Sequence, residues 1–425
     1  MNVLISAYAC NPTRGGEESF GFNWTQQWHA LGHEVWCLTT PQGRPDIEAH
    51  LAKNPLQRER LHMVYVPVPR LINYLYRWQV GVYLHYMVWQ YLAWRTARRL
   101  ASTTSFDLVH HATYGSLQMA SWLWRLKKPM VIGPLGGGQR APRAFRAYLS
   151  DWFKTETMRN VIAWLLTTFD PNVRQSLCHA DLVLATNTET AEAARRLGGR
   201  RVEMFLDSGL PESFAPTEFL VRTEAPVLRL LWLGRLVTRK GLPLVLEALA
   251  QVAPHVRFHL TIVGDGVQGA ELPGLIERHG LAGRVTWLGA LPWAQVREVF
   301  LSHDVFMFAS LRDSFAMQLL EAMAMGLPVI TLDHQGAHDF IPAAAGLKAP
   351  VTTPAATVAA LARAVEFCYN YPEQREAMGR AGYAFAQTQT WPARSMRLQE
   401  LAHHLLRSPL RPVRRVANRV FVAIT

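Results

Sequence analysis

Short apolar stretches alternate along the chain with longer amphipathic stretches, and this alternation occurs twice. In the first half, the predicted strands are 3–8, 34–39, 61–66, 108–110, 130–132 and 182–185, and the predicted helices are 16–31, 77–101, 115–127 and 188–197. In the second half, the predicted strands are 228–233, 259–263, 285–288, 305–308 and 329–331, and the predicted helices are 241–252, 292–302, 315–325 and 354–369. Strands that alternate with helices form parallel sheets covered on both faces, so the pattern predicts an α/β protein with two domains.

A polar stretch separates the two halves. Residues 211–226 are rich in Pro, Thr and Glu, a composition typical of a linker. A last amphipathic helix is predicted over about 391–407. The predicted boundaries are 1–215 for the first domain, 216–226 for the linker, 227–388 for the second domain, and 389–425 for a C-terminal helix with a basic tail.

Composition adds limits to this picture. With 425 residues, of which 49% are hydrophobic and 18% charged, the chain can form two well-cored domains. Its four cysteines are scattered without a Cys-x-x-Cys pair, which favours reduced cytosolic thiols over a zinc site or a disulfide framework. The first residues are typical of a buried strand rather than a signal peptide, so we expect a cytoplasmic protein.

The charge of the chain favours an anionic partner. Its net charge is +12 and its pI is near 9.8. Arginines cluster at three places: Arg95, Arg98 and Arg99; Arg140, Arg143 and Arg146; and Arg407, Arg411, Arg414, Arg415 and Arg419. The chain shows no nucleic-acid-binding module, so we expect no nucleic acid partner, and an anionic membrane surface is the better account.

Residues 71–100 are rich in aromatic residues and also carry basic residues. The aromatic residues are Tyr74, Tyr76, Trp78, Tyr83, Tyr86, Trp89, Tyr91 and Trp94, and basic residues lie among and beside them. This composition is typical of a helix on an anionic lipid surface, and a buried core helix is the alternative. Polar residues interrupt the segment too often for a membrane span.

Two carboxylates mark the most informative stretch, residues 310–331. Asp313 lies in a polar turn before an apolar helix, and Glu321 lies about two turns inside that helix, which Gly326 ends. The N-terminus of a helix is a natural place for a phosphate. Carboxylates on either side can hold hydroxyl groups, so the stretch predicts a site for a nucleotide sugar.

A second motif joins a predicted strand to a predicted helix. It reads Gly234-Arg235-Leu236-Val237-Thr238-Arg239-Lys240-Gly241. Two fixed cations can stabilise the negative charge on a departing diphosphate without a metal ion. We expect Arg239 to be a solvated neighbour of these two cations, Arg235 and Lys240.

These two motifs resemble the donor site of retaining glycosyltransferases of family 4. The family pattern ends in Glu-Ala-Met-Ala-x-Gly-x-Pro-Val-Ile, which residues 321–330 match throughout, and it includes Gly-Arg-x4-Lys-Gly. Asp313 replaces the usual Glu, and Ala316 replaces a common Gly. The resemblance implies the GT-B fold, with two Rossmann-like domains whose parallel sheets face a central cleft. It also implies catalytic roles for Arg235, Lys240, Asp313 and Glu321.

The same resemblance implies contacts around these four residues. The implied donor contacts are Gly15, Gly16, Gly234, Gly264, Asp265, Ser314, Phe315, Ala316 and Gly336. The candidate acceptor or sugar contacts are His110, His111, Gly136 and Gly137. Glu17 and Glu18 either cap the helix that follows the Gly15-Gly16 loop or contact the acceptor. The loop after residue 332 departs from the family's Gly-Gly-x-x-Glu at Gln335 and Asp339.

One family feature is missing. Many members carry a His at about the place of Pro134, where it contacts the transferred sugar, and this chain instead reads Gly133-Pro134-Leu135-Gly136-Gly137-Gly138. The triple glycine resembles a Gly-Pro-x-Gly-Gly-Gly subgroup with members in surface-polysaccharide assembly.

The resemblance implies a retaining, hexosyltransferase-type glycosyltransferase. It would move a sugar from a nucleotide-sugar donor to a lipid-linked or other glycan acceptor in cell-surface polysaccharide biosynthesis, at the inner face of the cytoplasmic membrane. No cofactor and no metal ion are expected, because no Asp-x-Asp motif is placed to hold a diphosphate. The alternatives are another GT-B sugar-nucleotide enzyme, such as an epimerase, and a non-catalytic scaffold of a polysaccharide assembly complex.

Overall fold

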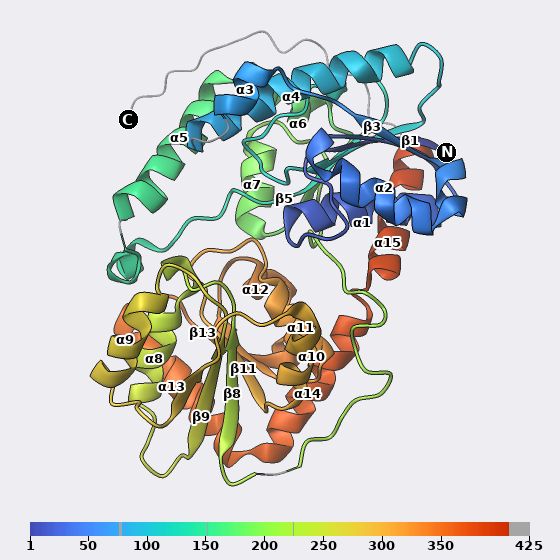
Figure 1. The fold of residues 1–425 in the computed structure, drawn as a ribbon. Helices are drawn as coiled ribbons and strands as arrows, with labels where there is room; N and C mark the ends of the chain where they lie inside the picture. Colours follow the sequence, from blue (N-terminus) through green and yellow to red (C-terminus); the bar gives the residue numbers. More distant parts are fainter. Residues whose placement is uncertain (76–78, 151, 224, 408–425) are drawn as a thin grey trace.

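The computed structural model describes residues 1–75, 79–150, 152–223 and 225–407. Two parallel sheets lie one above the other in Figure 1, and helices cover both faces of each. In the described residues the first sheet has the order β3-β2-β1-β4-β5-β6-β7 and the second has the order β10-β9-β8-β11-β12-β13.

The first sheet follows the predicted apolar runs, with one further strand, β7. Its strands are β1 (Asn2–Ala7), β2 (Glu34–Thr39), β3 (Leu61–Tyr65), β4 (Leu108–Thr113), β5 (Met130–Leu135), β6 (Leu182–Ala185) and β7 (Val202–Met204). Its helices are α1 (Glu17–Ala30), α2 (Arg44–Lys53), α3 (Arg70–Leu75), α4 (Gln79–Leu100), α5 (Met158–Phe169), α6 (Pro171–His179) and α7 (Thr188–Arg196). The Asn187 side chain caps α7 by accepting a hydrogen bond from the Thr190 N–H.

The second sheet has strands β8 (Leu228–Leu233), β9 (Phe258–Val263), β10 (Val285–Trp287), β11 (Val305–Phe308), β12 (Val329–Leu332) and β13 (Gly346–Ala349). Its helices are α8 (Leu242–Ala250), α9 (Leu272–Arg278), α10 (Trp293–Leu301), α11 (Met317–Ala324), α12 (Gln335–Phe340), α13 (Pro354–Asn370) and α14 (Pro372–Gln387). The strands β11 and β12 are buried along their whole length, which is why they are apolar runs in the sequence.

Most predicted elements are confirmed, and one is wrong. The helix predicted over 115–127 is a loop with a single 3-10 turn at Leu123–Leu126. The glycine and serine at its start instead let the chain turn beside the end of β5, where the Ser116 backbone pairs with Gly136. The sequence also did not reveal α2, α3, α5, α6, α9, α12 and α14, or the edge strands β7 and β13.

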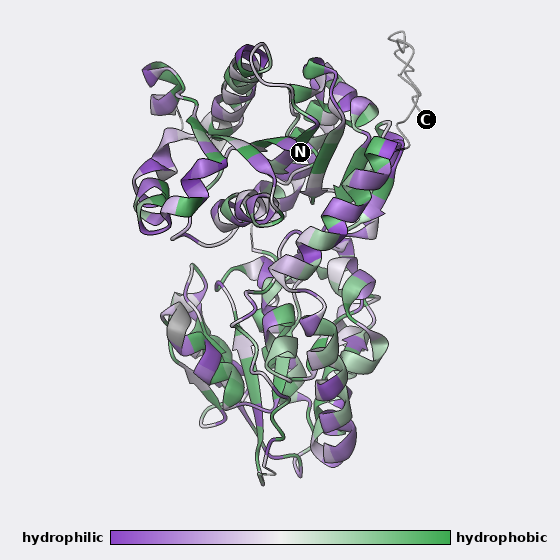
Figure 2. Cartoon of the chain, turned by 90° about the vertical axis from the view of Figure 1, so that its right-hand side faces the viewer, coloured by the Kyte–Doolittle hydropathy of each residue, from purple (hydrophilic) through white to green (hydrophobic). Residues whose placement is uncertain are grey.

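The chain crosses between the two halves more than once. The helix α15 (Trp391–Arg407) follows α14 of the second half and packs against α1, with Trp391 and Leu398 in the core of the first sheet (Figure 1). Figure 2 shows the hydrophobic strands inside both halves and helices with mixed faces around them. The basic tail predicted beyond residue 407 lies outside the described residues.

A second crossing lies inside the first predicted domain. The described part of residues 141–157, here called the crossing segment, follows the loop after β5 and packs on the second sheet's core, where Phe145 and Leu149 are buried. The Tyr148 hydroxyl donates a hydrogen bond to the Glu247 carboxylate on α8. The chain then returns to the first half through α5. The predicted domain boundaries stay a prediction, but this segment belongs by its packing to the second half.

The helix predicted from the aromatic stretch is α4. On α4, Tyr86 and Trp89 are buried in the first core, whereas Tyr91 on α4 and Tyr74 on the preceding α3 are exposed. Tyr76 and Trp78 lie outside the described residues. The segment is therefore a core helix on one side and a surface helix on the other. Within the part of the chain that is described, no helix is both long enough and apolar enough to cross a membrane.

Candidate functional site

The candidate site lies where loops at the carboxyl ends of the two sheets meet. The loop from β11 to α11 carries Asp313, and the turn after β8 carries Arg235 and Lys240. The glycine-rich loop after β5 faces them from the first half. In parallel sheets such ends gather ligand-binding residues at one edge.

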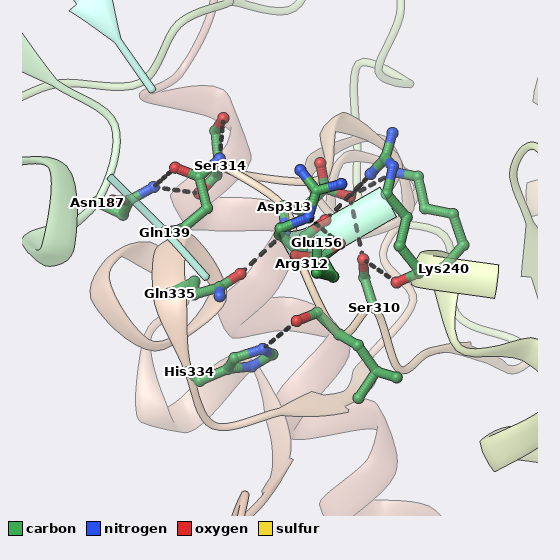
Figure 3. Close-up of polar contacts among 12 residues, drawn as sticks. Gln139, Glu156, Asn187, Lys240, Ser310, Arg312, Asp313, Ser314, His334 and Gln335 are labelled. Carbon is green, nitrogen blue, oxygen red and sulfur yellow. Dashed lines mark hydrogen bonds and ion pairs between the residues drawn. The ribbon is translucent and has the colours of Figure 1, made fainter. Parts of the chain in front are cut away.

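An ion pair lies at the centre of the site. Lys240 is buried, and its Nζ donates a hydrogen bond to the Asp313 carboxylate (Figure 3). The Ser310 hydroxyl donates to the same carboxylate over 3.2 Å. Burial by itself would raise the pKa of Asp313, but Lys240 and Arg239 outweigh it and lower this pKa below its ordinary value. Asp313 is therefore ionised and held in place.

The neighbouring cations differ from each other. The prediction that Arg239 is a solvated neighbour is wrong, since its side chain is only 24% exposed and its Nη1 lies 3.5 Å from the Asp313 carboxylate. It also donates to the Arg312 carbonyl over 3.1 Å. Arg235 is exposed and has no hydrogen-bonding or ionic partner among the described residues. The cation that is free to receive an anion is thus Arg235.

Glu321 lies inside α11, as predicted. Its carboxylate is partly buried and has no hydrogen bond or ion pair with any described residue. Burial without a partner raises its pKa to about 7. An unpaired carboxylate in such a place can accept hydrogen bonds from ligand hydroxyls.

The loop before α11 is held by the first half of the chain. The helix begins at Met317 instead of the predicted residue 315, so Phe315 and Ala316 lie in the loop. The Ser314 hydroxyl accepts a hydrogen bond from Gln139 over 3.2 Å, and its carbonyl accepts one from Asn187 over 3.4 Å. These bonds tie the acidic loop to the glycine-rich loop after β5.

Glycines allow this close approach. A Cβ atom on Gly136 would lie 2.5 Å from the Ser314 hydroxyl oxygen, and one on Gly336 would lie 1.9 Å from the Ser314 carbonyl oxygen. Both glycines therefore have a packing role at the junction of the two halves. Gly137 has a positive φ of 101° beside them.

Two residues that depart from the family loop bridge the halves. Gln335 has a left-handed φ of 54°, and its side chain accepts from the Asp313 N–H and donates to the Arg140 carbonyl, both over 2.9 Å. Asp339 accepts from the N–H and the hydroxyl of Thr188, over 2.7 and 2.6 Å. The sequence marked both positions only as departures, and their partners are too distant in sequence to be inferred.

The crossing segment adds charge to the junction. Glu156 is buried, with one carboxylate oxygen 2.9 Å from Arg312 Nε and the other without a hydrogen-bond partner among the described residues. Arg159 donates to the carbonyls of Gln139 and Gly137 over 3.3 and 3.4 Å. Sequence reasoning missed these residues, because nothing near them matches a motif.

The two histidines on β4 do not face the cleft, contrary to the predicted sugar contact. His110 accepts from the Trp28 indole over 3.0 Å and lies 2.8 Å from the Gly133 carbonyl. His111 lies between the hydroxyls of Ser6 and Tyr86. Both rings are fully buried, and burial lowers the pKa of His110 to about 4 and that of His111 to about 3. They are neutral core residues at physiological pH.

Two carboxyl groups from the first half also lie at this junction. Glu17 accepts from the Gly115 N–H over 3.4 Å, and burial, aided by Asp207, raises its pKa to about 7. Burial, with a smaller contribution from Asp313, raises the pKa of Asp207 to about 6. The two alternatives for Glu17 were a helix cap and an acceptor contact; its side chain makes no cap hydrogen bond.

The remaining predicted donor contacts are glycine turns. Gly15 and Gly16 have open space around them, and Gly16 has a φ of 69° at the start of α1. A Cβ atom on Gly264 would lie 1.9 Å from the Gly234 carbonyl oxygen, so these turns pack on each other. Asp265 is exposed and accepts a hydrogen bond from the Gly266 N–H. Their donor contacts stay predictions.

Curated relatives share part of the chain. The phosphatidylinositol N-acetylglucosaminyltransferase of Arabidopsis thaliana has a subunit that is 30% identical over 188 residues, which are 44% of this chain and 39% of that protein. The putative colanic acid biosynthesis glycosyltransferase WcaL from Escherichia coli is 28% identical over 188 residues, or 42% and 46% of the two chains. The matched region spans less than half the length of each relative.

Solved structures resemble the whole chain. The structure of HepE from Anabaena in complex with UDP has a TM-score of 0.62 at 18% identity, covering 95% of this chain and 100% of that one. Sucrose-phosphate synthase from Thermosynechococcus elongatus has a TM-score of 0.63 at 18% identity, covering 96% and 99%. At such identities the likeness shows the fold, which is GT-B.

Two family models cover most of the sequence. Residues 15–206 match the glycosyl transferase 4-like domain, and residues 224–385 match the glycosyl transferases group 1. The first match ends at the last strand of the first sheet, and the second begins just before β8. The two-sheet architecture and these consecutive matches show that this chain belongs to the group 1 glycosyltransferases of the GT-B fold.

Proposed function

We propose that the protein transfers a sugar from a nucleotide-sugar donor to a hydroxyl group of a glycan acceptor. The observation that carries the proposal is the set of Arg235, Lys240, Asp313 and Glu321 at one edge of the second sheet. Its cations suit a diphosphate, and its carboxylates suit the hydroxyls of a sugar and a ribose. In this proposal Glu321 binds the nucleotide side of the donor and Asp313 binds the transferred sugar.

The ion pair gives the second domain a prepared site. Asp313 needs no reorganisation to accept sugar hydroxyls, because Lys240 and Ser310 already fix it. Arg235, exposed and unpaired among the described residues, binds the diphosphate. As the diphosphate leaves, Arg235 and Lys240 stabilise its growing charge, so we propose a metal-independent reaction.

We further propose a hexosyl transfer with retention of anomeric configuration. The bond from the anomeric carbon to the phosphate oxygen breaks, and the acceptor oxygen forms its bond on the same face. The acceptor proton passes to the departing phosphate oxygen. This route needs no covalent nucleophile.

The place of action is also a proposal. The exposed Arg95, Arg98 and Arg99 lie together at the end of α4, where each cation near an anionic surface contributes about 1 kcal/mol. We propose a cytoplasmic enzyme held at the inner face of the cytoplasmic membrane, acting in cell-surface polysaccharide biosynthesis. WcaL, by its name a colanic acid enzyme, is a relative consistent with that role.

A thermal-shift screen against nucleoside diphosphates tests the proposal. UDP is the first probe, because HepE was crystallised with it, and GDP and ADP follow. We expect one diphosphate to raise the Tm of the protein and Arg235→Ala to abolish that rise. A protein that none of the three stabilises would contradict the donor site. Free sugar released from a nucleotide sugar, with no transfer to any acceptor, would favour an epimerase-like enzyme instead.

A further inference from the structure

Two hollows in the first half of the chain share side chains. One is a cavity of about 350 Å³ lined by Glu17, Val82, Tyr83, Tyr114, Ser116 and Met119. The other is a crevice between α4 and α5, lined in part by Tyr83, Met87, Met119, Trp122 and Leu166. Because Tyr83 and Met119 border both, the two hollows lie next to each other. We call them the Glu17 cavity and the α4–α5 crevice.

The Glu17 cavity has a carboxyl group in its lining. Within the described residues the Glu17 carboxylate accepts one hydrogen bond, from the Gly115 N–H, and it therefore keeps acceptor capacity for ligand hydroxyls. Ser116, which lines the cavity, pairs through its backbone with Gly136, and a Cβ atom on Gly136 would lie 2.5 Å from the Ser314 hydroxyl oxygen. The cavity therefore lies beside the candidate donor site. Apolar walls with a few polar groups are the usual lining of a small-molecule site.

The α4–α5 crevice leads to an exposed apolar surface. On α4, Leu84, Met87 and Tyr91 are 40%, 41% and 39% exposed, at spacings that place them on one face. On α5 the exposed side chains are Met158, Val161, Trp164, Leu165 and Phe169, at 44%, 49%, 56%, 42% and 67%. No residue of α5 is buried, although the helix is mostly apolar. Figure 1 shows α5 on the outside of the first half, near α3 and α4.

The basic and aromatic residues around this apolar surface indicate what kind of partner covers it. Contiguous exposed apolar side chains mark interaction sites. Arg98 and Arg125 stack on the Trp94 ring at 5.2 and 5.6 Å, and Arg125 also stacks on Trp122, which lines the crevice, at 4.6 Å. Apolar side chains within a basic, aromatic rim are complementary to an anionic lipid bilayer.

We propose that the acceptor is a lipid-linked sugar, with its sugar in the Glu17 cavity and its hydrocarbon chain along the α4–α5 crevice. The crevice, of about 10 Å³, is too small to enclose a chain, so the chain lies along it against Met87 and Leu166 and continues into the bilayer. The inference rests on the proposed function, and it decides between a lipid-linked and a soluble acceptor. It also moves the membrane contact from α4 alone to α4 and α5 together.

Alkyl glycosides test this path directly. The probes are methyl, hexyl, octyl and decyl glycosides of glucose, galactose, mannose and N-acetylglucosamine, below their critical micelle concentrations, and calorimetry on the full chain measures binding. We expect at least one sugar to bind with an affinity that rises about tenfold for every two methylenes and then levels off, since each buried methylene contributes a constant increment. Equal affinity at all chain lengths, or binding of none, would overturn the proposal.

Two variants test the two ends of the path, and a third variant is the control. Met87→Lys should remove the dependence on chain length and leave methyl glycoside affinity unchanged. Glu17→Gln should lower the affinity of every chain length by a similar factor, about tenfold. Leu56→Lys, at an exposed apolar residue outside both hollows, is the matched control and should behave as wild type. If the affinity of Met87→Lys still depends on alkyl chain length, the alkyl chain does not lie in the crevice.

Vesicles and molecular mass test what covers α5. The protein should float with vesicles that contain phosphatidylglycerol. The double variant Trp164→Glu, Phe169→Glu should no longer float with them. A dimer at micromolar concentration that these substitutions convert to a monomer would instead assign the face to a second copy and overturn the proposal. UDP binding is measured on the same samples. Loss of UDP binding would contradict the proposed donor site, whereas UDP binding without glycoside or vesicle binding would contradict only the lipid-linked acceptor.

Discussion

The two walls of the cleft are built in different ways. The wall from the second half holds its key carboxylate in an ion pair, between Lys240 and Asp313, with Arg239 beside it. The wall from the first half holds Glu17 and Asp207, which make no ion pair with any described residue and have raised pKa values. A wall of paired and free cations suits a diphosphate, and a wall of unpaired carboxyls beside tyrosines suits hydroxyl groups. In the function that we propose, this difference assigns the donor to the second half and the acceptor to the first half.

The largest expected effect tests the cationic wall. Arg235→Ala and Lys240→Ala should each lower turnover by about 100-fold or more, because each loses a charge that stabilises the leaving diphosphate. Arg235→Ala should keep the Tm, since Arg235 is exposed. Lys240→Ala should lower the free energy of unfolding by about 1–3 kcal/mol, because it leaves a partly buried carboxylate with one distant cation.

Steady-state kinetics and thermal unfolding measure both effects. The matched control is Arg278→Ala, at an exposed arginine on α9, which should change neither quantity. Activity within a few-fold of wild type for both Arg235→Ala and Lys240→Ala would show that this wall does not bind the diphosphate.

The next test separates the two carboxylates of the second half. Glu321→Gln should weaken nucleoside diphosphate binding by about tenfold, because it replaces an unpaired acceptor of ribose hydroxyls. Asp313→Asn should leave diphosphate binding nearly unchanged and lower transfer to the acceptor. Calorimetry with UDP and a transfer assay report the two effects. The opposite pattern would exchange the roles of these residues.

The pKa of Glu321 makes a pH-dependent prediction. Its folded-state pKa of about 7 lies above the ordinary 4.5, so the ionised form gains population as pH rises from 6 to 8, and diphosphate affinity should rise several-fold more in wild type than in Glu321→Gln. Stability should change in the opposite direction. A raised pKa means that the folded chain holds its proton more tightly, so the contribution of Glu321 to stability falls between pH 4.5 and 7.

Chemical denaturation checks that second part. Glu321→Gln should gain stability relative to wild type at pH 8 and little or none at pH 4. A stability difference that does not vary with pH would show that Glu321 has an ordinary pKa.

The smallest expected effect concerns the junction between the walls. Gln335→Gly relieves the left-handed φ of 54° but removes the hydrogen bonds to the Asp313 N–H and the Arg140 carbonyl. The two effects oppose each other, so we expect a net change of about 1 kcal/mol or less in stability and a few-fold increase in KM. Faster hydrogen exchange of the Asp313 amide would show that the bridge is lost. An unchanged exchange rate would show that the bridge does not hold the loop.

Local patterns in the sequence predicted the second half well. The strands at 228–233 and 305–308 are observed at the predicted residues, because buried parallel strands are continuous apolar runs. Lys240 and Asp313 were predicted from contiguous motifs at strand ends, and they meet because β8 and β11 are neighbours in the sheet. In the second half, the position of a motif after a strand therefore predicted where its residues lie in the structure.

The first half depended much more on contacts between distant segments. His110 and His111 follow a strand pattern that the sequence could not orient, and burial placed both rings in the core. The crossing segment carries no motif, and its packing on the second sheet became visible only in three dimensions.

By itself, the sequence determined the two-sheet architecture, the family resemblance and the motifs of the donor site, because each depends on residues close together in the chain. Only the tertiary structure decided that Arg239 joins the ion pair, that Gln335 and Asp339 bridge the halves, and that Glu17 and side chains of α4 line one cavity. These features arise where segments far apart in sequence exclude water together. Their stabilising contacts follow from the packing of whole elements, which no local pattern of residues encodes.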